Sequence, residues 1–195
     1  MPSELRAGPT GPTAPTRRRR HVHPPDCGVV CRRVRSASER ADHLAIRHRI
    51  FVDEQAVFTG SDLDPRDGEE STIPVLGYSD GVAVGTVRLF PLDPAEGVWQ
   101  GDRLAVLTPY RTLGIGAPLV RYATATAAAL GGRTMTAHIQ PANVVFFQRL
   151  GWVPIGDSEI YAGLPHQPMR IVLSTRDEGL ATVRRLEDGI SARDR

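Results

Sequence analysis

Residues 109–120, PYRTLGIGAPLV, constrain the fold of this chain more than any other stretch. An arginine precedes two glycines, and an alanine-rich apolar run follows. This pattern predicts a strand over 98–107 that turns directly into a helix running to Leu130. The first N–H groups of such a helix have no partner within it, and glycines let a ligand come close. The segment therefore predicts a strand–turn–helix unit that binds an anion.

The glycine spacing excludes the common nucleotide-binding loops. A P-loop needs a lysine after its second glycine, but all 24 basic residues of this chain are arginine. The dinucleotide fingerprint also fails, because Leu119 stands where its third glycine belongs. The absence of lysine further excludes a lysine nucleophile or Schiff base.

Composition indicates one globular domain within the 195 residues, with 41% hydrophobic and 24% charged residues. No apolar run reaches the roughly 18 residues of a membrane span, and no secretory signal is present, so we expect a cytoplasmic protein without a membrane partner. Five arginines face Glu4 and Asp26 in residues 1–26, whereas 19 arginines face 20 acidic residues in the remainder. A nearly neutral domain argues against a nucleic-acid partner.

The two cysteines do not form a disulfide framework in such a chain. Together with two histidines they form an H-x-H-x3-C-x3-C string, made of His21, His23, Cys27 and Cys31. Its spacing matches none of the common zinc signatures, so we predict no metal site.

The chain divides into a disordered Pro/Arg-rich tail over 1–26, a domain over 27–174, and an amphipathic charged helix or tail over 175–195. That last segment could pack on the domain or on a second copy, which leaves a homodimer open. Strands are predicted at 29–35, on both sides of the turn at 79–81, and at 98–107, 134–140, 152–161 and 168–174. Helices are predicted at 38–55, from the glycine turn to 130, and at 143–150. An acidic loop is predicted at 59–71. Hairpins mixed with crossover helices predict an α/β (α+β) fold, a mixed sheet with helices on both faces.

The segment RTLGIGA resembles the R-x-x-G-x-G/A loop of the GNAT superfamily of N-acetyltransferases, and HIQPANVVFFQRLGW resembles the motif that follows it there. RHRIFVDEQ and AGLPHQPM resemble a narrower branch that is distantly similar to acyl-homoserine-lactone synthases. The set VRLF, WQGDRLAV, AHIQPANV and LPHQPM is similar to a bacterial group labelled nitrogen-starvation N-acetyltransferases. The resemblance covers about residues 29–174 and implies a mostly antiparallel central sheet.

The resemblance implies an acetyl-CoA site. Backbone N–H groups of residues 112–117 would hold the pyrophosphate, Arg111 would add charge, and the strand before them would run beside the pantetheine arm. Phe147 stands where many members carry the tyrosine that protonates the departing thiolate. The implied cofactor residues are Leu104, Ala105, Val106, Arg111, Thr112, Leu113, Gly114, Ile115, Gly116, Ala117, Asn143 and Phe147.

Attack of an amine on a thioester needs a base. His138 is the first candidate, because imidazole titrates near neutral pH; a strand histidine bonded to backbone is the alternative. Glu54 and Asp102 are candidates for binding the amine or for water-mediated base work. Arg88 and Arg103 would bind an acidic acceptor, or else pair with Asp102 or Glu54. His166 is expected near the cleft as a substrate-binding residue.

These expectations predict an N-acetyltransferase that moves an acetyl group from acetyl-CoA directly to the amine of a small molecule in a ternary complex. Phe147 keeps open a non-catalytic acyl-CoA sensor with the same fold. A third reading is an acyl-homoserine-lactone-type synthase, which would require S-adenosylmethionine.

Overall fold

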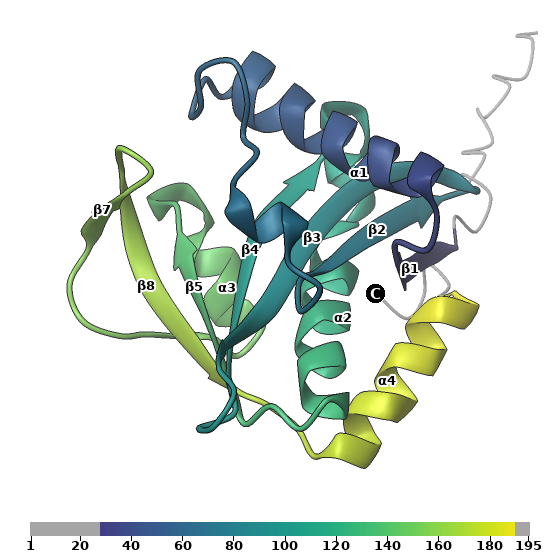
Figure 1. Ribbon diagram of the computed structural model, residues 1–195, viewed down its shortest axis with the longest axis vertical. Helices are drawn as coiled ribbons and strands as arrows, with labels where there is room; N and C mark the ends of the chain where they lie inside the picture. Colours follow the sequence, from purple (N-terminus) through teal and green to yellow (C-terminus); the bar gives the residue numbers. More distant parts are fainter. Residues whose placement is uncertain (1–27, 190–195) are drawn as a thin grey trace, which may run out of the picture.

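A mixed sheet of eight strands forms the centre of the computed structural model, which describes residues 28–189. Helix α1 covers one face of the sheet, and helices α2 and α4 cover the other (Figure 1). The predicted tail over 1–26 lies outside the described residues, as do His21, His23 and Cys27. The α/β fold with helices on both faces is confirmed.

The elements follow the order that the sequence predicts, with the late strands divided differently. The strands are β1 Val29–Arg33, β2 Ile73–Ser79, β3 Val82–Asp93, β4 Val98–Val106, β5 Thr134–Ile139, β6 Val153–Pro154, β7 Glu159–Tyr161 and β8 Leu164–Val172. The α-helices are α1 Ala37–His48, α2 Gly116–Ala129, α3 Val144–Arg149 and α4 Arg176–Asp188. Four shorter helical turns are η1 Arg49–Glu54, η2 Pro65–Gly68, η3 Thr108–Leu113 and η4 Pro141–Asn143.

The strand order is β1-β2-β3-β4-β5-β8-β6, and β7 pairs with β8. Every pairing is antiparallel except that of β4 with β5. The sheet is therefore mostly antiparallel, as the resemblance implied. Its one parallel junction lies where the chain crosses over through α2.

Local signals explain several boundaries. The Ser36 hydroxyl accepts a hydrogen bond from the Glu39 N–H at 3.2 Å and caps α1. The predicted helix over 38–55 is α1 continued by the π-helix η1. Asp80 and Gly81 both have positive φ, which suits the two-residue turn between β2 and β3.

Two apolar cores lie on opposite faces of the sheet. The larger one packs α2 against the strands through Ile115, Leu119 and Tyr122, all fully buried. The smaller one packs the end of α1 on the other face through Ile46 and Ile50. No helix within residues 28–189 is long and apolar enough to cross a membrane.

The C-terminal helix α4 packs on α2, which is one of the arrangements that its amphipathic pattern left open. Leu186 is buried in the larger core, and Tyr122 donates a hydrogen bond to Glu187 at 2.7 Å. A Cβ at Gly179 would lie 2.7 Å from the Ala125 carbonyl oxygen and 2.9 Å from Ala128 Cβ. The two helices therefore cross at a distance that only glycine permits.

Gly179→Ala is expected to lower the free energy of unfolding by about 2 kcal/mol, because the added methyl overpacks the α2–α4 crossing. In a helix without a close neighbour the same change would raise the free energy of unfolding by about 1 kcal/mol. The direction of the change in a urea titration therefore shows whether the helices are in close contact. Gly68→Ala is the matched control, since nothing lies within 4 Å of a Cβ there. A stabilised Gly179→Ala variant would contradict this packing.

Candidate active site

Strands β4 and β5 pair over only three residues each and then separate. Val98, Trp99 and Gln100 pair with Thr134, Met135 and Thr136, whereas β4 continues to Val106 and β5 to Ile139. Beyond this junction neither strand supplies hydrogen bonds to the other. A gap in the middle of the sheet results.

A β-bulge in β4 accompanies this separation. Arg88 pairs with Asp102 and Thr86 with Ala105, so β4 contains one residue more than β3 over this stretch. The extra residue is Arg103, whose φ of 52° is uncommon for a side chain other than glycine. Bulges bend a strand and increase its twist, which directs the second half of β4 away from β5.

The gap exposes backbone polar groups of β4. Leu107 N–H donates to Val84 O on β3 at 2.9 Å, and alternate residues of a strand direct their polar groups to opposite sides. Those of Leu104 and Val106 therefore point toward the gap. The Val106 carbonyl oxygen accepts a hydrogen bond from Arg111 Nε at 3.1 Å.

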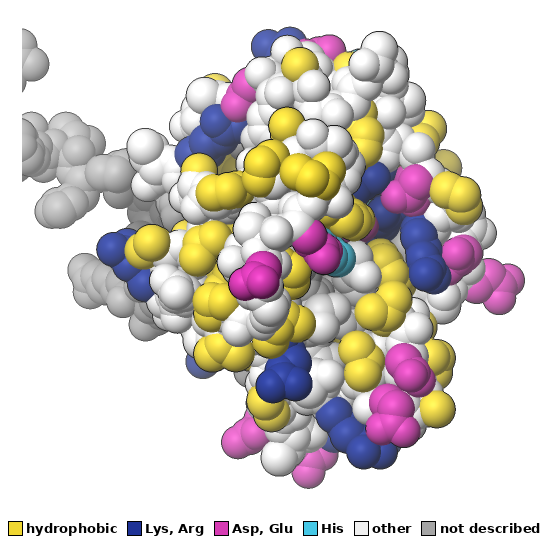
Figure 2. Space-filling model, turned by 90° about the vertical axis from the view of Figure 1, so that its left-hand side faces the viewer, with side chains coloured by type: hydrophobic (Ala, Val, Ile, Leu, Met, Phe, Trp, Pro, Cys, Tyr) yellow, Lys and Arg dark blue, Asp and Glu magenta, His cyan; other side chains and the backbone are white. Residues whose placement is uncertain are grey.

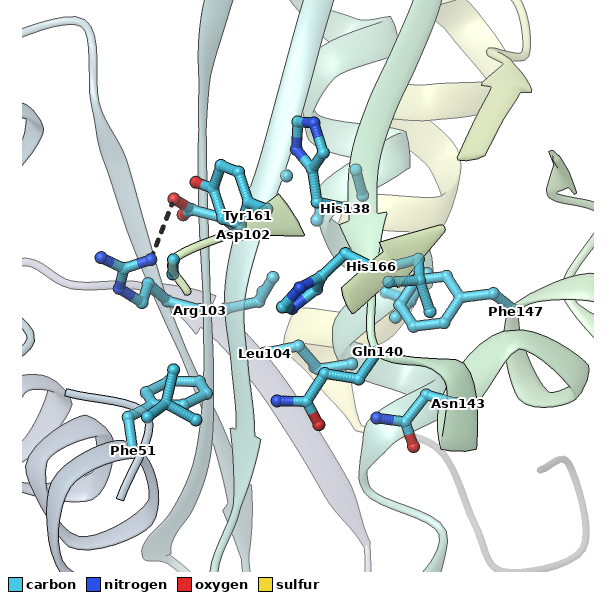
Figure 3. A pocket seen from close by; sticks show the side chains of 18 of the residues that line it. Phe51, Asp102, Arg103, Leu104, His138, Gln140, Asn143, Phe147, Tyr161 and His166 are labelled. Carbon is cyan, nitrogen blue, oxygen red and sulfur yellow. Dashed lines mark ion pairs between the residues drawn. The ribbon is translucent and has the colours of Figure 1, made fainter. Parts of the chain in front are cut away.

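A cleft with an empty volume of about 900 Å³, open to solvent, runs through this gap. Its side chains come from η1, β4, β5, α2, α3 and the β7–β8 hairpin (Figure 3). Figure 2 shows the molecule from the β7–β8 side, where a histidine is visible near the centre beside an acidic side chain and among apolar ones.

The two sides of the cleft differ in polarity. On the side of α2 and α3 the lining is apolar and includes Val120, Ala123, Phe147 and Trp152. On the side of α1 the lining is mostly polar or aromatic, and it includes Phe51, Gln55, Phe58, Asp102, Arg103, His138, Gln140, Tyr161 and His166. The cleft thus joins an apolar channel to a polar chamber through the sheet.

Three arginines lie in or beside the chamber, of which Arg103 lines the cleft, and aspartates pair with all three. Arg88 is 1% exposed, and its guanidinium donates to both oxygens of Asp102 at 2.6 and 2.8 Å and to both oxygens of Asp64 at 2.7 Å. Arg103 contacts Asp64 at 3.0 Å and Asp62 at 3.2 Å. Such paired contacts compensate the cost of burying the charges.

The third arginine ties the acidic loop to α1. Arg47, fully buried, contacts Asp62 at 2.7 Å and Asp67 at 2.5 Å. Burial raises the pKa of the Asp67 carboxyl, but hydrogen bonds and charge from Arg47 outweigh it and hold that pKa well below its usual range. Ion pairs therefore fix the predicted loop over 59–71 to α1, β3 and β4. We call this loop the acidic strap.

At the other end of the cleft, α2 begins without a side-chain cap. Gly114 ends η3 in the left-handed conformation with φ of 74°, and Ile115, a residue that cannot cap, precedes the helix. The first backbone N–H groups of α2 therefore lack acceptors within the helix. Arg111, beside them, contacts Glu54 at 2.5 Å.

Glu54 lies outside the cleft, in a separate hollow with Thr108 and Tyr110. Hydrogen bonds from Thr108 and then Arg111 hold the pKa of Glu54 below its usual range. A carboxylate with a lowered pKa is a weak base. Glu54 therefore pairs with Arg111 and does not line the chamber.

Two histidines reach the chamber around Tyr161. His138 Nε2 lies 2.7 Å from Glu159 Oε1, and the His138 ring stacks on Tyr161 with centroids 4.2 Å apart. His166 meets the Tyr161 ring edge-on at 5.5 Å, and its Nδ1 lies 2.9 Å from the Leu164 carbonyl oxygen.

The predicted residues separate into two groups. The cleft is lined by Asp102, Arg103, Leu104, His138, Asn143, Phe147 and His166. Outside it lie Glu54, Arg88, Ala105, Val106 and the loop residues 111–117. Asp102 is engaged by Arg88, and both Arg88 and Arg103 take the ion-paired alternative, so neither offers a free charge to an acceptor.

Sequence reasoning missed several lining residues, of which Tyr161 matters most, and it also missed Glu159, which lies outside the lining and contacts His138. They belong to a tight hairpin in which Ala162 and Gly163 have positive φ and Glu159 pairs with His166. The signal was an Ala-Gly turn between two short strand-forming runs. Within residues 28–189 no three potential metal ligands of the His, Cys, Asp or Glu type gather in one place.

Comparison with known proteins agrees with this geometry. The profile of the Acetyltransferase (GNAT) family matches residues 38–152. A protein named "Uncharacterized N-acetyltransferase YjcF", from Bacillus subtilis (strain 168), is 26% identical over 129 residues, covering 66% of this chain and 89% of that one.

Solved structures share the fold. Escherichia coli ElaA superposes with a TM-score of 0.65 at 21% identity, covering 73% of this chain and 98% of that one. The CoA-dependent acyl-homoserine lactone synthase BjaI, solved with SAM and isopentyl-CoA, superposes with a TM-score of 0.61 at 18% identity, covering 83% and 89%.

Asp67→Asn is expected to lower the free energy of unfolding at pH 7 by about 3 kcal/mol, because it leaves buried arginine charge uncompensated. The folded pKa of Asp67 lies below its unfolded value, so its contribution is present above about pH 4 and is lost as pH falls further. Urea titrations of both proteins should therefore converge in acid.

Glu69→Gln is the matched control, since the Arg66–Glu69 pair at 2.8 Å lies on the surface of the same loop. It should change stability by no more than about 0.5 kcal/mol. Equal effects of the two substitutions would refute a structural role for the buried pairs.

Proposed function

Since this chain belongs to the acetyltransferase (GNAT) family, we propose that it transfers an acetyl group from acetyl-CoA to the amine of a small molecule, directly and within a ternary complex. The narrower similarity to the nitrogen-starvation N-acetyltransferases is part of this proposal and rests on the segments that carry it.

The observation that carries the proposal is the cleft through the sheet between β4 and β5. A pantetheine arm is an extended chain with two amides, and the inward-facing polar groups of Leu104 and Val106 offer partners to them. The uncapped start of α2 and the Arg111 guanidinium lie at one end of β4, as a pyrophosphate requires. The Asn143 side chain lines the cleft without a hydrogen bond to any other described residue, so it is available to the cofactor.

Direct transfer is favoured by the position of Cys31. This free cysteine is buried in β1, away from the cleft, and burial raises its pKa to about 12. A thiol that stays protonated is a poor nucleophile. No cysteine among the cleft-lining residues competes for an acyl intermediate, so the amine is the nucleophile in this proposal.

The ion pairs around the chamber limit which chemical class of amine can be the acceptor. Arg88 and Arg103 are engaged by aspartates, and the chain contains no lysine. A carboxylate entering the chamber would find no unpaired arginine among the lining residues and would meet Asp102. We therefore expect a neutral or cationic amine without an acidic group, held against aromatic walls such as Phe51 and Phe58.

One observation favours a second candidate, an acyl-CoA sensor without turnover. Phe147 occupies the position of the usual acid and is buried against Phe146 and Trp152, with ring centroids 5.3 Å from each. A phenyl ring cannot protonate a thiolate. Thiolates leave readily near neutral pH, which is why the transferase remains our first choice.

Calorimetric titration with acetyl-CoA, with ADP as the control, tests the donor site; a micromolar Kd, about −8 kcal/mol, is expected. Release of free CoA thiol is then measured with phenylethylamine, tyramine, histamine, putrescine and glutamate, of which glutamate should react most slowly. Binding without turnover of any amine would favour the sensor. Lactone formation with S-adenosylmethionine and an acyl-CoA would favour the synthase, and absence of binding would overturn all three.

Arg111→Gln is expected to weaken acetyl-CoA binding at least tenfold, because charge-assisted hydrogen bonds to a phosphate contribute about 1.5–3 kcal/mol. Its fold should persist, since Arg111 and Glu54 are both partly exposed. Arg121→Gln, an exposed arginine on α2, is the matched control. Similar affinities of the two variants in calorimetry would remove Arg111 from the site.

A further inference from the structure

His166 holds a distinctive place among the polar residues of the chamber. Its side chain is 6% exposed, yet it lines the cleft, and its ring projects into the middle of it (Figure 3). It comes from β8, directly after the Ala162–Gly163 turn, and it pairs across the hairpin with Glu159. A tight hairpin therefore fixes its backbone.

One hydrogen bond fixes the tautomer of His166. Nδ1 lies 2.9 Å from the Leu164 carbonyl oxygen. A carbonyl can only accept, so Nδ1 carries the hydrogen, and in the neutral ring Nε2 presents a lone pair. In the described part of the chain no group donates to Nε2, which leaves it available to a ligand in the cleft.

The competing bases are less suitable. His138 Nε2 is engaged by Glu159, and His138 Nδ1 is buried from solvent without a partner. Both oxygens of Asp102 accept from Arg88. Among these groups, only His166 combines a free lone pair with access to the cleft.

We propose that His166 Nε2 is the general base of the transfer reaction. This inference rests on the proposed function. The proton passes from the amine nitrogen to Nε2 as that nitrogen forms a bond to the thioester carbonyl carbon. The C–S bond then breaks, its electron pair stays on sulfur, and the imidazolium returns the proton to the thiolate, giving an amide and CoA.

The surroundings of His166 suit this role. Glu159 faces it from β7, His138 from β5, and Asp102 and Arg103 line the same chamber from β4. Asp102 is paired with Arg88, so Glu159, opposite His166 across the hairpin, is the carboxylate left to stabilise the imidazolium that forms when the proton arrives. Tyr161, held between the two imidazoles, keeps the ring from turning and is a positioning residue.

The test compares kcat at saturating phenylethylamine over pH in the wild type, His166→Gln and His48→Gln, a histidine outside the cleft. The kcat of the wild type should fall toward low pH, because a protonated base cannot take up the proton of the amine. In His166→Gln, kcat should be at least about 100-fold lower and should no longer fall toward low pH. This variant should still bind CoA as the wild type does. Added imidazole should restore part of the activity of His166→Ala.

The outcomes separate the two claims. A wild type without turnover of any amine overturns the proposed function and this inference with it. An active wild type whose kcat and pH profile survive in His166→Gln overturns this inference alone. If His166→Gln does not bind CoA, the imidazole rescue of His166→Ala decides whether His166 is the base. If His166→Ala binds CoA and imidazole does not restore its activity, His166 is not the base.

Discussion

The structure depends on the ion pairs that hold a strained residue in the middle of β4. Arg103 has a positive φ, which costs an ordinary side chain of order 1 kcal/mol. Its guanidinium meets Asp62 and Asp64, which the acidic strap brings over the sheet. The bulge therefore persists because the side chain at its apex is bound on one face. Without the bulge, β4 would continue beside β5, and the sheet would have no gap.

The same network decides what the cleft can bind. It occupies Asp102 and Arg103 of the chamber and leaves side chains such as Asn143 and His166 able to respond to a ligand. On the opposite face α2 and α3 supply an apolar wall that ends in Phe147 and Trp152. A thioester crossing the sheet would thus have its acyl carbon and sulfur at the chamber and its pantetheine arm along the apolar side chains.

Local signals allowed much of the fold to be predicted from sequence. The Arg111–Gly114–Gly116 turn, the Ser36 cap and the Asp80–Gly81 hairpin are each determined by a few adjacent residues. The strap was not predicted as such, because Asp62 and Arg103 lie 41 residues apart and their pairing needs the folded sheet. Residue type did not locate the bulge either, because the residue with positive φ is Arg103 and not a glycine. Which of His138 and His166 has a free nitrogen depends on the β5–β8 register and on the Leu164 carbonyl.

A crystal structure with CoA bound tests the role of the cleft most directly. We expect pantetheine density in the gap between Leu104 and Ala137, the pyrophosphate against residues 114–117 and Arg111, and the sulfur facing the chamber that contains His166. Density for CoA elsewhere on the surface, with β4 and β5 still separated by an empty gap, would contradict it.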